Sequence, residues 1–441
     1  MIARIRARDR MGQPEEWLVF GFLLVILLGA ALLSLPVAAR DGHSIGLFDG
    51  LFTAASAVCV TGLVAVDTGA TFAPFGQLVL LALIQVGGLG FMVFATMILV
   101  MLGRKISIKG RMLIRESMNG SSLTDLGGLT RLYLLLALGI ELVGAALLAL
   151  RFVPLYGVKK GLWYALFHAV SAFCNAGFDL FGGFSSLTAH ARDPLVLLTV
   201  AALIVLGGLG FAVILETLRN RQGFRAMSLH ARIVLTFTPA LLLAGTAYFM
   251  LVERMDALNA LFQSVTLRTA GFNTVDLSAM KDGSKLFSTM LMAIGASPAS
   301  TGGGMKTTTV AVVAMLILSV VKGDSEVNAA RRRLSGDVVH RALVVVTLFL
   351  TTLTLGTLAV TLIEDGRFTL ADLLFECASA MGTVGVSAVG TPNLTAASRA
   401  VLIPMMFLGR VGPLTLAVAV ARRQGRVRGP SKYPEEKIMI G

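Results

Sequence analysis

The sequence predicts an all-α polytopic membrane protein made of four repeats, each containing a spanning helix, a short re-entrant helix and a second spanning helix. Three observations predict this fold class. Of the 441 residues, 56% are hydrophobic and only 14% are charged, whereas a soluble domain carries about a quarter charged residues. Eight long apolar runs form four successive pairs, and one short apolar run stands between the two members of each pair. Each short run leads into a tetrad of residues with glycine in the third position.

The eight long runs are each able to cross a hydrocarbon core of about 30 Å. They lie at residues 17–35, 76–102, 129–150, 195–217, 231–252, 287–320, 342–363 and 399–421. Four arginines stand in the first ten residues, but no cleavage site of small residues follows the first run. We therefore expect the first run to be a retained helix and not a cleaved signal.

The four short stretches are too short to cross a bilayer and have the length of re-entrant helices. Each contains a Leu-Phe pair followed by small residues, and they lie at residues 47–60, 162–174, 257–267 and 370–381. A stretch of this kind stands between the two long runs of every pair. The predicted architecture is therefore eight transmembrane helices plus four re-entrant pore helices around a pseudo-fourfold pore.

Four tetrads follow the short stretches and define the repeat. They are Val60-Thr61-Gly62-Leu63, Asn175-Ala176-Gly177-Phe178, Thr269-Ala270-Gly271-Phe272 and Thr383-Val384-Gly385-Val386. Their glycines are 115, 94 and 114 residues apart, and Cys59 and Cys174 both stand three residues before a glycine. A period of this kind indicates repeated structural units. We expect the four repeats at residues 1–110, 111–225, 226–325 and 326–441.

The net charge of +13 favours membrane topology over nucleic-acid binding as its explanation. Placing the N-terminus in the cytoplasm assigns 25 of the 38 lysines and arginines to cytoplasmic segments, namely residues 1–16, 103–131, 218–232, 321–341 and 422–441. Because cytoplasmic loops of membrane proteins are enriched in these residues, we expect both termini inside and the tetrads toward the outside. Three cysteines do not form a disulfide framework.

The tetrads predict a cation site. Non-helical backbone at membrane depth is tolerated only when it is buried in protein or lines water, and a ring of backbone carbonyls can replace the hydration shell of an ion. Glycine reaches backbone dihedral angles closed to other residues. The C-terminus of each short helix, which carries partial negative charge, points at its tetrad. The alternative is that these glycines only allow helices to pack closely.

The segment GASPASTGGGMKTTT at 295–309 interrupts the run 287–320. Pro298 and the glycines Gly302, Gly303 and Gly304 cannot continue a helix comfortably. We expect two half-helices joined by a loop within the membrane, below the tetrads. The alternative is a passive kink. Lys306, at the end of this segment, is expected to anchor the loop to carbonyls or to an acidic partner.

Arg410 stands within the last apolar run, between Gly409 and Val411. A charge at membrane depth is costly and usually faces a pore or a partner, and a cation below a cation site raises the barrier to ions. The alternative is a structural anchor to carbonyls of the loop, and both roles are compatible. We expect Arg268 to brace the neighbouring tetrad.

Other charged residues carry weaker predictions. Asp67, Asp179 and Asp276 follow three of the tetrads and are expected to form an acidic outer mouth that concentrates cations. Glu141 is expected to pair within the helix bundle. The basic run at 331–334 is either a plain cytoplasmic surface or a dock for a regulatory partner.

On these residues the sequence resembles the KtrB/TrkH/HKT superfamily of potassium-translocating subunits, over essentially the whole chain. The resemblance rests on the four tetrads, the segment 295–309 and FLGRVGP at 407–413. Eight spans without extra N-terminal helices look more like KtrB than TrkH. The resemblance implies a potassium-binding filter at the sixteen tetrad residues, with glycine in all four repeats indicating potassium over sodium. It also implies a gate at Gly302, Gly303, Gly304, Lys306 and Arg410.

The resemblance further implies a homodimer in the plasma membrane of a bacterium, with a cytoplasmic KtrA-like nucleotide-binding regulatory ring as partner. Nucleotide would bind only to that partner, because this chain has no nucleotide-binding domain. Potassium is the expected ion, and sodium is retained as a second one. The competing functions are a less selective sodium/potassium channel and an alternating-access cation carrier. No catalytic constellation is found in the sequence, so we expect no enzyme.

Overall fold

The computed structural model describes residues 14–90, 126–324, 326–329 and 332–416. It is almost entirely helical. The ends of the predicted runs 76–102 and 399–421 lie outside the described residues, as does part of the basic run at 331–334.

The described helices can be grouped by their place in the four predicted repeats. The first helices are α2 (Pro14–Leu33), α8 (Leu126–Tyr156), α12 (Leu229–Val252) and α16 (Gly336–Glu364). The short helices are α3 (Leu47–Val58), α9 (Val158–Phe173), α13 (Ala257–Thr266) and α17 (Leu370–Gly382). The second helices are α5 (Pro74–Leu89), α10 (Pro194–Leu209), α14 (Asp282–Ala293) and α18 (Ala396–Val411). The rest are α4 (Thr68–Thr71), α11 (Phe211–Arg219), α15 (Thr307–Lys322), four 3₁₀ turns, η1 (Pro36–Ala38), η2 (Thr188–His190), η3 (Phe224–Ala226) and η4 (Thr391–Asn393), and a hairpin of β1 (Asn328–Ala329) and β2 (Arg332–Arg333).

Within the described ranges, four helices are long and apolar enough to cross a membrane, and they are the first helices of the four repeats, α2, α8, α12 and α16. The bent pair α10 and α11 makes a fifth if it counts as one span. The second helices are shorter, at 12 to 16 residues. The predicted total of eight spans therefore stays a prediction.

The run 195–217 is not the continuous helix that the sequence predicts. It breaks at Gly210 into α10 and α11, which are bent by 95°. Gly90, Gly210 and Gly412, at matching places in three repeats, share φ of 85 to 92° and ψ of 130 to 134°. Only glycine adopts such angles without strain. The sequence predicted an interruption in the run 287–320, at the segment 295–309, and it did not predict this bend at Gly210.

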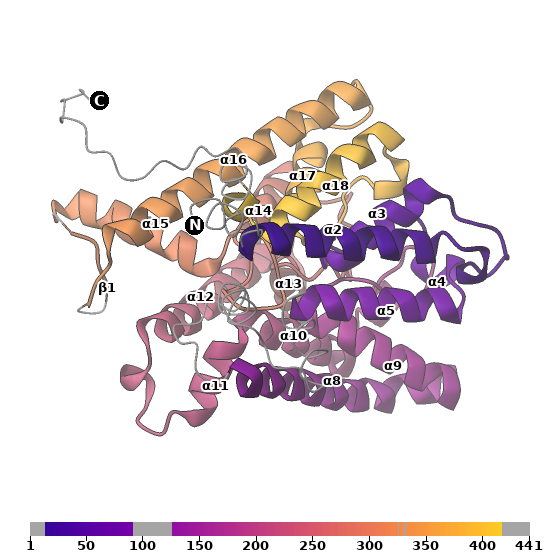
Figure 1. Cartoon of the computed structure of the whole chain (residues 1–441), viewed down its shortest axis with the longest axis horizontal. Coiled ribbons are helices and arrows are strands. Elements are labelled where there is room, and N and C mark those ends of the chain that lie inside the picture. Colours follow the sequence, from indigo (N-terminus) through magenta and orange to yellow (C-terminus); the bar gives the residue numbers. More distant parts are fainter. Residues whose placement is uncertain (1–13, 91–125, 325, 330–331, 417–441) are drawn as a thin grey trace, which may run out of the picture.

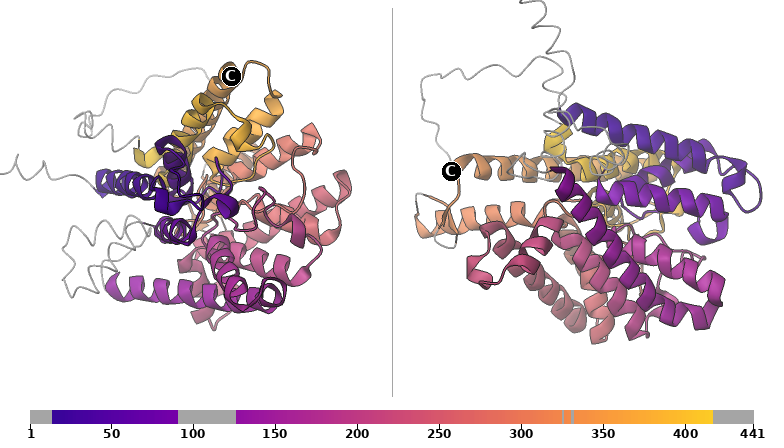
Figure 2. Two further views of the ribbon diagram at one scale, coloured as in Figure 1. Left: turned by 90° about the vertical axis from the view of Figure 1, so that its right-hand side faces the viewer. Right: turned by 60° about the horizontal axis from the view of Figure 1, so that its bottom comes forward.

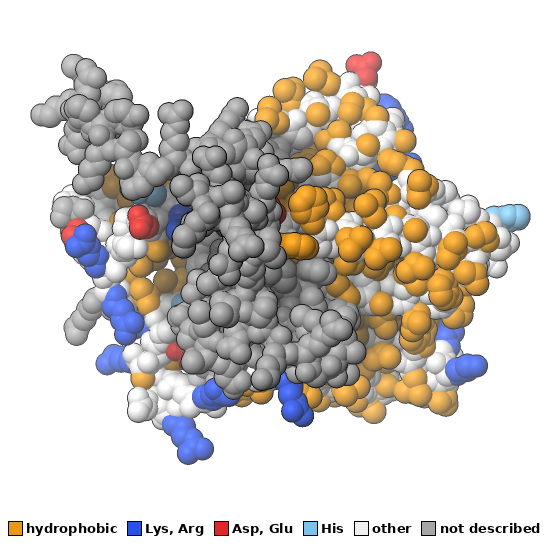
Figure 3. Space-filling view, viewed as in Figure 1, with side chains coloured by type: hydrophobic (Ala, Val, Ile, Leu, Met, Phe, Trp, Pro, Cys, Tyr) orange, Lys and Arg blue, Asp and Glu red, His pale blue; other side chains and the backbone are white. Residues whose placement is uncertain are grey.

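The repeats follow one another around a common centre. Figure 2 (left) shows the chain passing in sequence order around the molecule, from the indigo helices through purple and pink to yellow. In Figure 1 the longest helices run side by side, and α11, α15 and the hairpin gather at one end. Exposed apolar side chains cover the other part of the surface in Figure 3, while lysines and arginines gather mostly at the end near the hairpin and α11.

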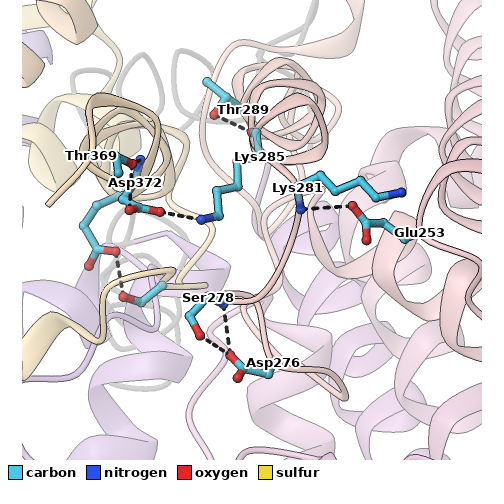
Figure 4. A network of polar contacts seen from close by, with 10 residues as sticks. Glu253, Asp276, Ser278, Lys281, Lys285, Thr289, Thr369 and Asp372 are labelled. Atoms are coloured by element: carbon cyan, nitrogen blue, oxygen red, sulfur yellow. Dashed lines mark hydrogen bonds and ion pairs between the residues drawn. The ribbon is translucent and has the colours of Figure 1, made fainter.

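Polar contacts join neighbouring repeats where the second helices begin. Lys285 of α14 forms an ion pair of 2.7 Å with Asp372 at the start of α17 (Figure 4), and Arg399 of α18 forms one of 2.7 Å with Asp49 of α3. Gln77 of α5 instead accepts a hydrogen bond from the indole of Trp163 at 2.8 Å. Gln77, Lys285 and Arg399 each stand three residues after the first residue of their helix.

Candidate functional site

The four tetrads have the same backbone conformation. Their first residues, Val60, Asn175, Thr269 and Thr383, have φ of 50 to 68°, and their glycines, Gly62, Gly177, Gly271 and Gly385, have φ of 69 to 96°. Left-handed φ at a residue other than glycine is strained. Its recurrence at the same position in four separate segments shows that the surrounding structure imposes the conformation.

The tetrads meet in a closed ring. A Cβ atom on Gly62 would lie 2.5 Å from the carbonyl oxygen of Ala176, and one on Gly177 would lie 2.8 Å from that of Ala270. One on Gly271 would lie 2.5 Å from the carbonyl oxygen of Val384, and one on Gly385 would overlap that of Thr61. Each tetrad therefore touches the next, and the fourth touches the first. Any side chain at these glycines would collide with the neighbouring backbone.

The N–H group of the second residue of each tetrad is hydrogen-bonded to the preceding short helix, whereas most of the tetrad carbonyls are not hydrogen-bonded. The amides of Thr61, Ala176 and Val384 donate to serine carbonyls of the preceding short helices at 2.8 Å, and that of Ala270 donates to the Thr266 carbonyl at 3.0 Å. No described residue donates to a carbonyl oxygen of the first three residues of any tetrad. Since buried carbonyls are normally paired, this ring is a cluster of acceptors that needs a partner from outside the chain.

Hydroxyl groups of the short helices hold the tetrads in place, and the sequence reasoning missed them. Ser56 and Ser379 accept from the N–H of Gly62 and Gly385 at 3.0 Å. Ser171 and Thr266 donate to the carbonyls of Phe178 and Phe272, at 2.8 and 2.5 Å. A detectable signal existed, because each of these residues stands four positions after the phenylalanine of the Leu-Phe pair.

A cavity of ≈ 300 Å³ opens on one side of the ring. The four tetrad glycines line it together with Asp67, Asp179, Asn273 and Ser387, among others. Burial, aided by the charge of Asp67, raises the pKa of Asp179 to about 6. Asp276 is not part of the lining, contrary to the predicted acidic mouth. It hydrogen-bonds with Ser278, which lowers the pKa of Asp276.

The loop between α14 and α15, residues 294–306, is called the interhelix loop. It lies on the opposite side of the ring from this cavity. Gly302 packs against the Thr269 hydroxyl and Gly303 against the Thr383 hydroxyl, so closely that neither glycine leaves room for a Cβ. The side-chain amide of Asn175, which hydrogen-bonds to Thr269 Oγ1 at 3.1 Å, also borders Gly302. The predicted loop is therefore present, and it touches the first residues of three tetrads.

The glycine motifs of the other repeats hold this loop. Thr301 donates through its N–H to the Gly207 carbonyl at 3.1 Å, and Ser297 does so to the Gly208 carbonyl at 3.0 Å. The N–H of Gly304 donates to the Gly409 carbonyl at 3.2 Å. These glycines belong to the sequences LGGLGF at 206–211 and LGRVGP at 408–413, which align with each other. The alignment does not show that their carbonyls are acceptors for the loop.

Arg410 links the loop to the first repeat. Its guanidinium donates to the carbonyl of Thr301 in the loop and to the carbonyls of Gly87 and Gly88 at the end of α5. Lys306 donates to the Gly302 carbonyl at 2.7 Å, so it binds a carbonyl of its own loop. At the other end of the loop, Arg268 donates to the Gly295 carbonyl at 3.4 Å. Arg268 therefore contacts the loop.

Glu141, which is 2% exposed, pairs within the bundle as expected. The amide of Gln85 donates to both of its carboxyl oxygens, at 3.0 and 3.1 Å. Among the described residues, no group of three or more histidine, cysteine, aspartate or glutamate side chains is arranged to hold a metal ion. Backbone carbonyl oxygens arranged in a ring have the chemistry to coordinate a cation.

The long apolar helices and the comparisons with known proteins identify the chain as a helical membrane transporter. It matches the TrkH family, described as "Cation transport protein", over residues 22–243 and 228–428. The chain belongs to this family. The description of the family is one of ion transport.

Similar proteins support the assignment over the full length. The chain is 41% identical to the Ktr system potassium uptake protein B of Bacillus subtilis, covering 97% of both chains. It is 36% identical to the potassium/sodium uptake protein NtpJ of Enterococcus hirae, covering 100% of both. The solved structure of the potassium transporter TrkH from Vibrio parahaemolyticus superposes with a TM-score of 0.70 at 18% identity, covering 90% of this chain and 84% of that one.

Proposed function

We propose that this chain is the pore-forming membrane subunit of a potassium uptake system. The observation that carries the proposal is the closed ring of tetrads whose carbonyls have no donor among the described residues. An ion that sheds its water needs a shell of oxygen atoms already held in place. In this view the sixteen tetrad residues form the filter, and one chain supplies a whole pore.

Potassium is the proposed ion because glycine stands at the third position of all four tetrads and because relatives named as potassium uptake proteins match the full length. A channel that conducts both sodium and potassium is the second candidate. The name of the Enterococcus hirae relative, a potassium/sodium uptake protein, favours it. Both candidates use the same ring and differ in its selectivity.

The interhelix loop is the proposed gate. Gly302 and Gly303 lie directly against the filter residues Thr269 and Thr383, so the loop stands in the path below the ring. Arg410 and Lys306 bind loop carbonyls, which holds the loop in this position. Arg410 also places a positive charge next to the path, where it opposes a cation. Opening then requires the loop to leave its carbonyl acceptors.

Control by a cytoplasmic nucleotide-binding ring is proposed through the hairpin between α15 and α16. Val327 beside the hairpin packs against Val312 of α15 and Val339 of α16, and α15 continues directly into the loop. Arg332 and Arg333 are exposed on the hairpin and are suited to an acidic partner surface. A partner that displaces the hairpin would therefore move the gate. The proposal also includes that two copies of this chain form a homodimer in the bacterial plasma membrane. Both termini of each copy would lie in the cytoplasm.

The test is ion flux through the purified chain in liposomes, with potassium and sodium gradients measured separately. We expect potassium flux that exceeds sodium flux, and rescue of growth at low potassium in a bacterium that lacks its uptake systems. Equal fluxes would favour the sodium/potassium channel. Flux limited to the slow turnover typical of alternating access would favour the carrier and contradict a continuous pore.

A further inference from the structure

The residue that follows each Leu-Phe pair is polar and buried in all four short helices. These residues are Thr53, His168, Gln263 and Glu376, and their exposed fractions are 1%, 0%, 0% and 0%. Buried polar side chains are costly unless they are hydrogen-bonded. Neither the tetrads nor the loop explains why a polar residue stands at this position in every repeat.

In the second repeat, His168 connects the short helix to the segment that leaves the tetrad. Its Nδ1 lies 2.7 Å from the Tyr164 carbonyl, so Nδ1 carries the proton and Nε2 is the acceptor. Nε2 accepts from the N–H of Leu180 at 3.4 Å, and Leu180 stands three residues after Gly177. The ring also stacks on Phe181 with a centroid distance of 4.4 Å.

In the fourth repeat, Glu376 makes the corresponding connection. One carboxyl oxygen accepts from the Ser387 hydroxyl and the other from the Thr391 hydroxyl, both at 2.6 Å. Ser387 and Thr391 both lie in the segment that follows Gly385. A side chain of the short helix is therefore hydrogen-bonded to the segment after the tetrad in both repeats.

The first and third repeats lack this connection. The hydroxyl of Thr53 and both polar side-chain atoms of Gln263 have no hydrogen-bond partner among the described residues. Because the ring runs in the order of the repeats, the second and fourth repeats lie on opposite sides of it. On one diagonal of the ring, the short-helix side chain is therefore hydrogen-bonded to the segment that leaves the tetrad, and on the other diagonal it is not.

We propose that His168 and Glu376 are positioning residues that set the ion selectivity of the ring. The inference rests on the proposed function. In the snug-fit account of selectivity, a ring distinguishes two ions of equal charge because its carbonyls resist closing around the smaller one. We call the hydrogen bonds of His168 and of Glu376 to the segments that leave their tetrads the two braces. Because they lie on opposite sides, they fix the distance across the ring. With a single brace, the opposite side of the ring would be free to move inward around a smaller ion.

The experiment compares potassium and sodium flux in liposomes for four variants of the full chain. His168→Leu and Glu376→Leu remove the two braces, whereas Thr53→Val and Gln263→Leu remove the unpartnered polar atoms at the same position. We expect the potassium-to-sodium ratio to fall about tenfold in each of the first two variants, the factor given by the loss of roughly one hydrogen bond. The two matched controls should keep the ratio of the unaltered protein.

A lower total flux with an unchanged ratio in His168→Leu and Glu376→Leu would overturn the inference, because a merely structural role changes the amount of active protein and not its selectivity. If both variants fail to fold, Ser387→Ala removes one donor to Glu376 from the cavity side. It should lower the ratio about threefold, and an unchanged ratio overturns the inference. An unaltered protein without potassium preference would instead contradict the proposed function.

Discussion

The ring of tetrads and the interhelix loop beneath it are built in opposite ways. The ring uses one backbone conformation four times, with left-handed φ at the first and third residues of every tetrad. The loop occurs in the third repeat. Carbonyl acceptors from the second and fourth repeats hold it, and Arg410 connects it to the first repeat. Coordination of a spherical ion favours equal contributions from all sides. Control favours a single movable part, since one loop can move without rebuilding the ring.

Deleting residues 299–305 has the largest expected effect on flux, because the deletion removes most of the interhelix loop and leaves the ring of tetrads in place. If the open state is a minor state of about 1%, removal of the block raises potassium flux about a hundredfold. The measurement is flux of the purified chain in liposomes without any partner. Flux that stays at the level of the unaltered protein in a folded variant would mean that the loop is not the gate.

Arg410→Gln tests whether the loop depends on its clamp. The change removes a charged donor that joins Thr301 to Gly87 and Gly88. Hydrogen bonds to charged groups are worth about 1.5–3 kcal/mol, so we expect basal flux to rise about tenfold. Arg410→Lys keeps the positive charge but cannot join three carbonyls. This variant therefore separates the effect of the charge on the ion from the effect of the hydrogen bonds that hold the loop. Equal flux in the lysine variant and the unaltered protein would assign the effect to charge.

Gly62→Ser tests the role of the ring of tetrads in ion selectivity. A Cβ here would lie 2.5 Å from the Ala176 carbonyl oxygen, so the first and second tetrads must move apart. We expect the potassium-to-sodium flux ratio to fall about fivefold as the carbonyl shell loosens. Gly183→Ser is the control, because Gly183 also has positive φ but has open space around it. Similar ratios in both variants would contradict the filter assignment.

Acidification gives the smallest expected effect. The pKa of Asp179 is raised to about 6 by burial and by the charge of Asp67, so its carboxyl is ionised at pH 7.5 and mostly neutral at pH 5.5. Loss of this negative charge beside the ring lowers the local cation concentration, and we expect potassium flux to fall about twofold. Asp179→Asn should show low flux at both pH values. A pH dependence that persists in this variant would assign it to another group.

Much of the helical order and the position of the site could be predicted from local sequence. The Leu-Phe pairs mark the short helices, and the break at 294–306 follows from Pro298 and three consecutive glycines. The bend at Gly210 was missed. The run 195–217 contains Gly207, Gly208 and Gly210, and glycine inside an apolar run is compatible with a continuous helix. The need for glycine at position 210 appears only in the tertiary structure, where the Pro298 carbonyl leaves no room for a Cβ on this residue.

By itself, the sequence determined a membrane chain with four matching tetrads and one interrupted segment, because apolar run length, glycine and proline act on the neighbouring residues. The tertiary structure decided that the tetrads close into a ring, that Arg410 binds carbonyls of two other segments, and that His168 and Glu376 reach beyond their helices. These contacts join residues from separate elements, up to more than 300 positions apart. Such pairings depend on how the helices pack, and no local pattern encodes them.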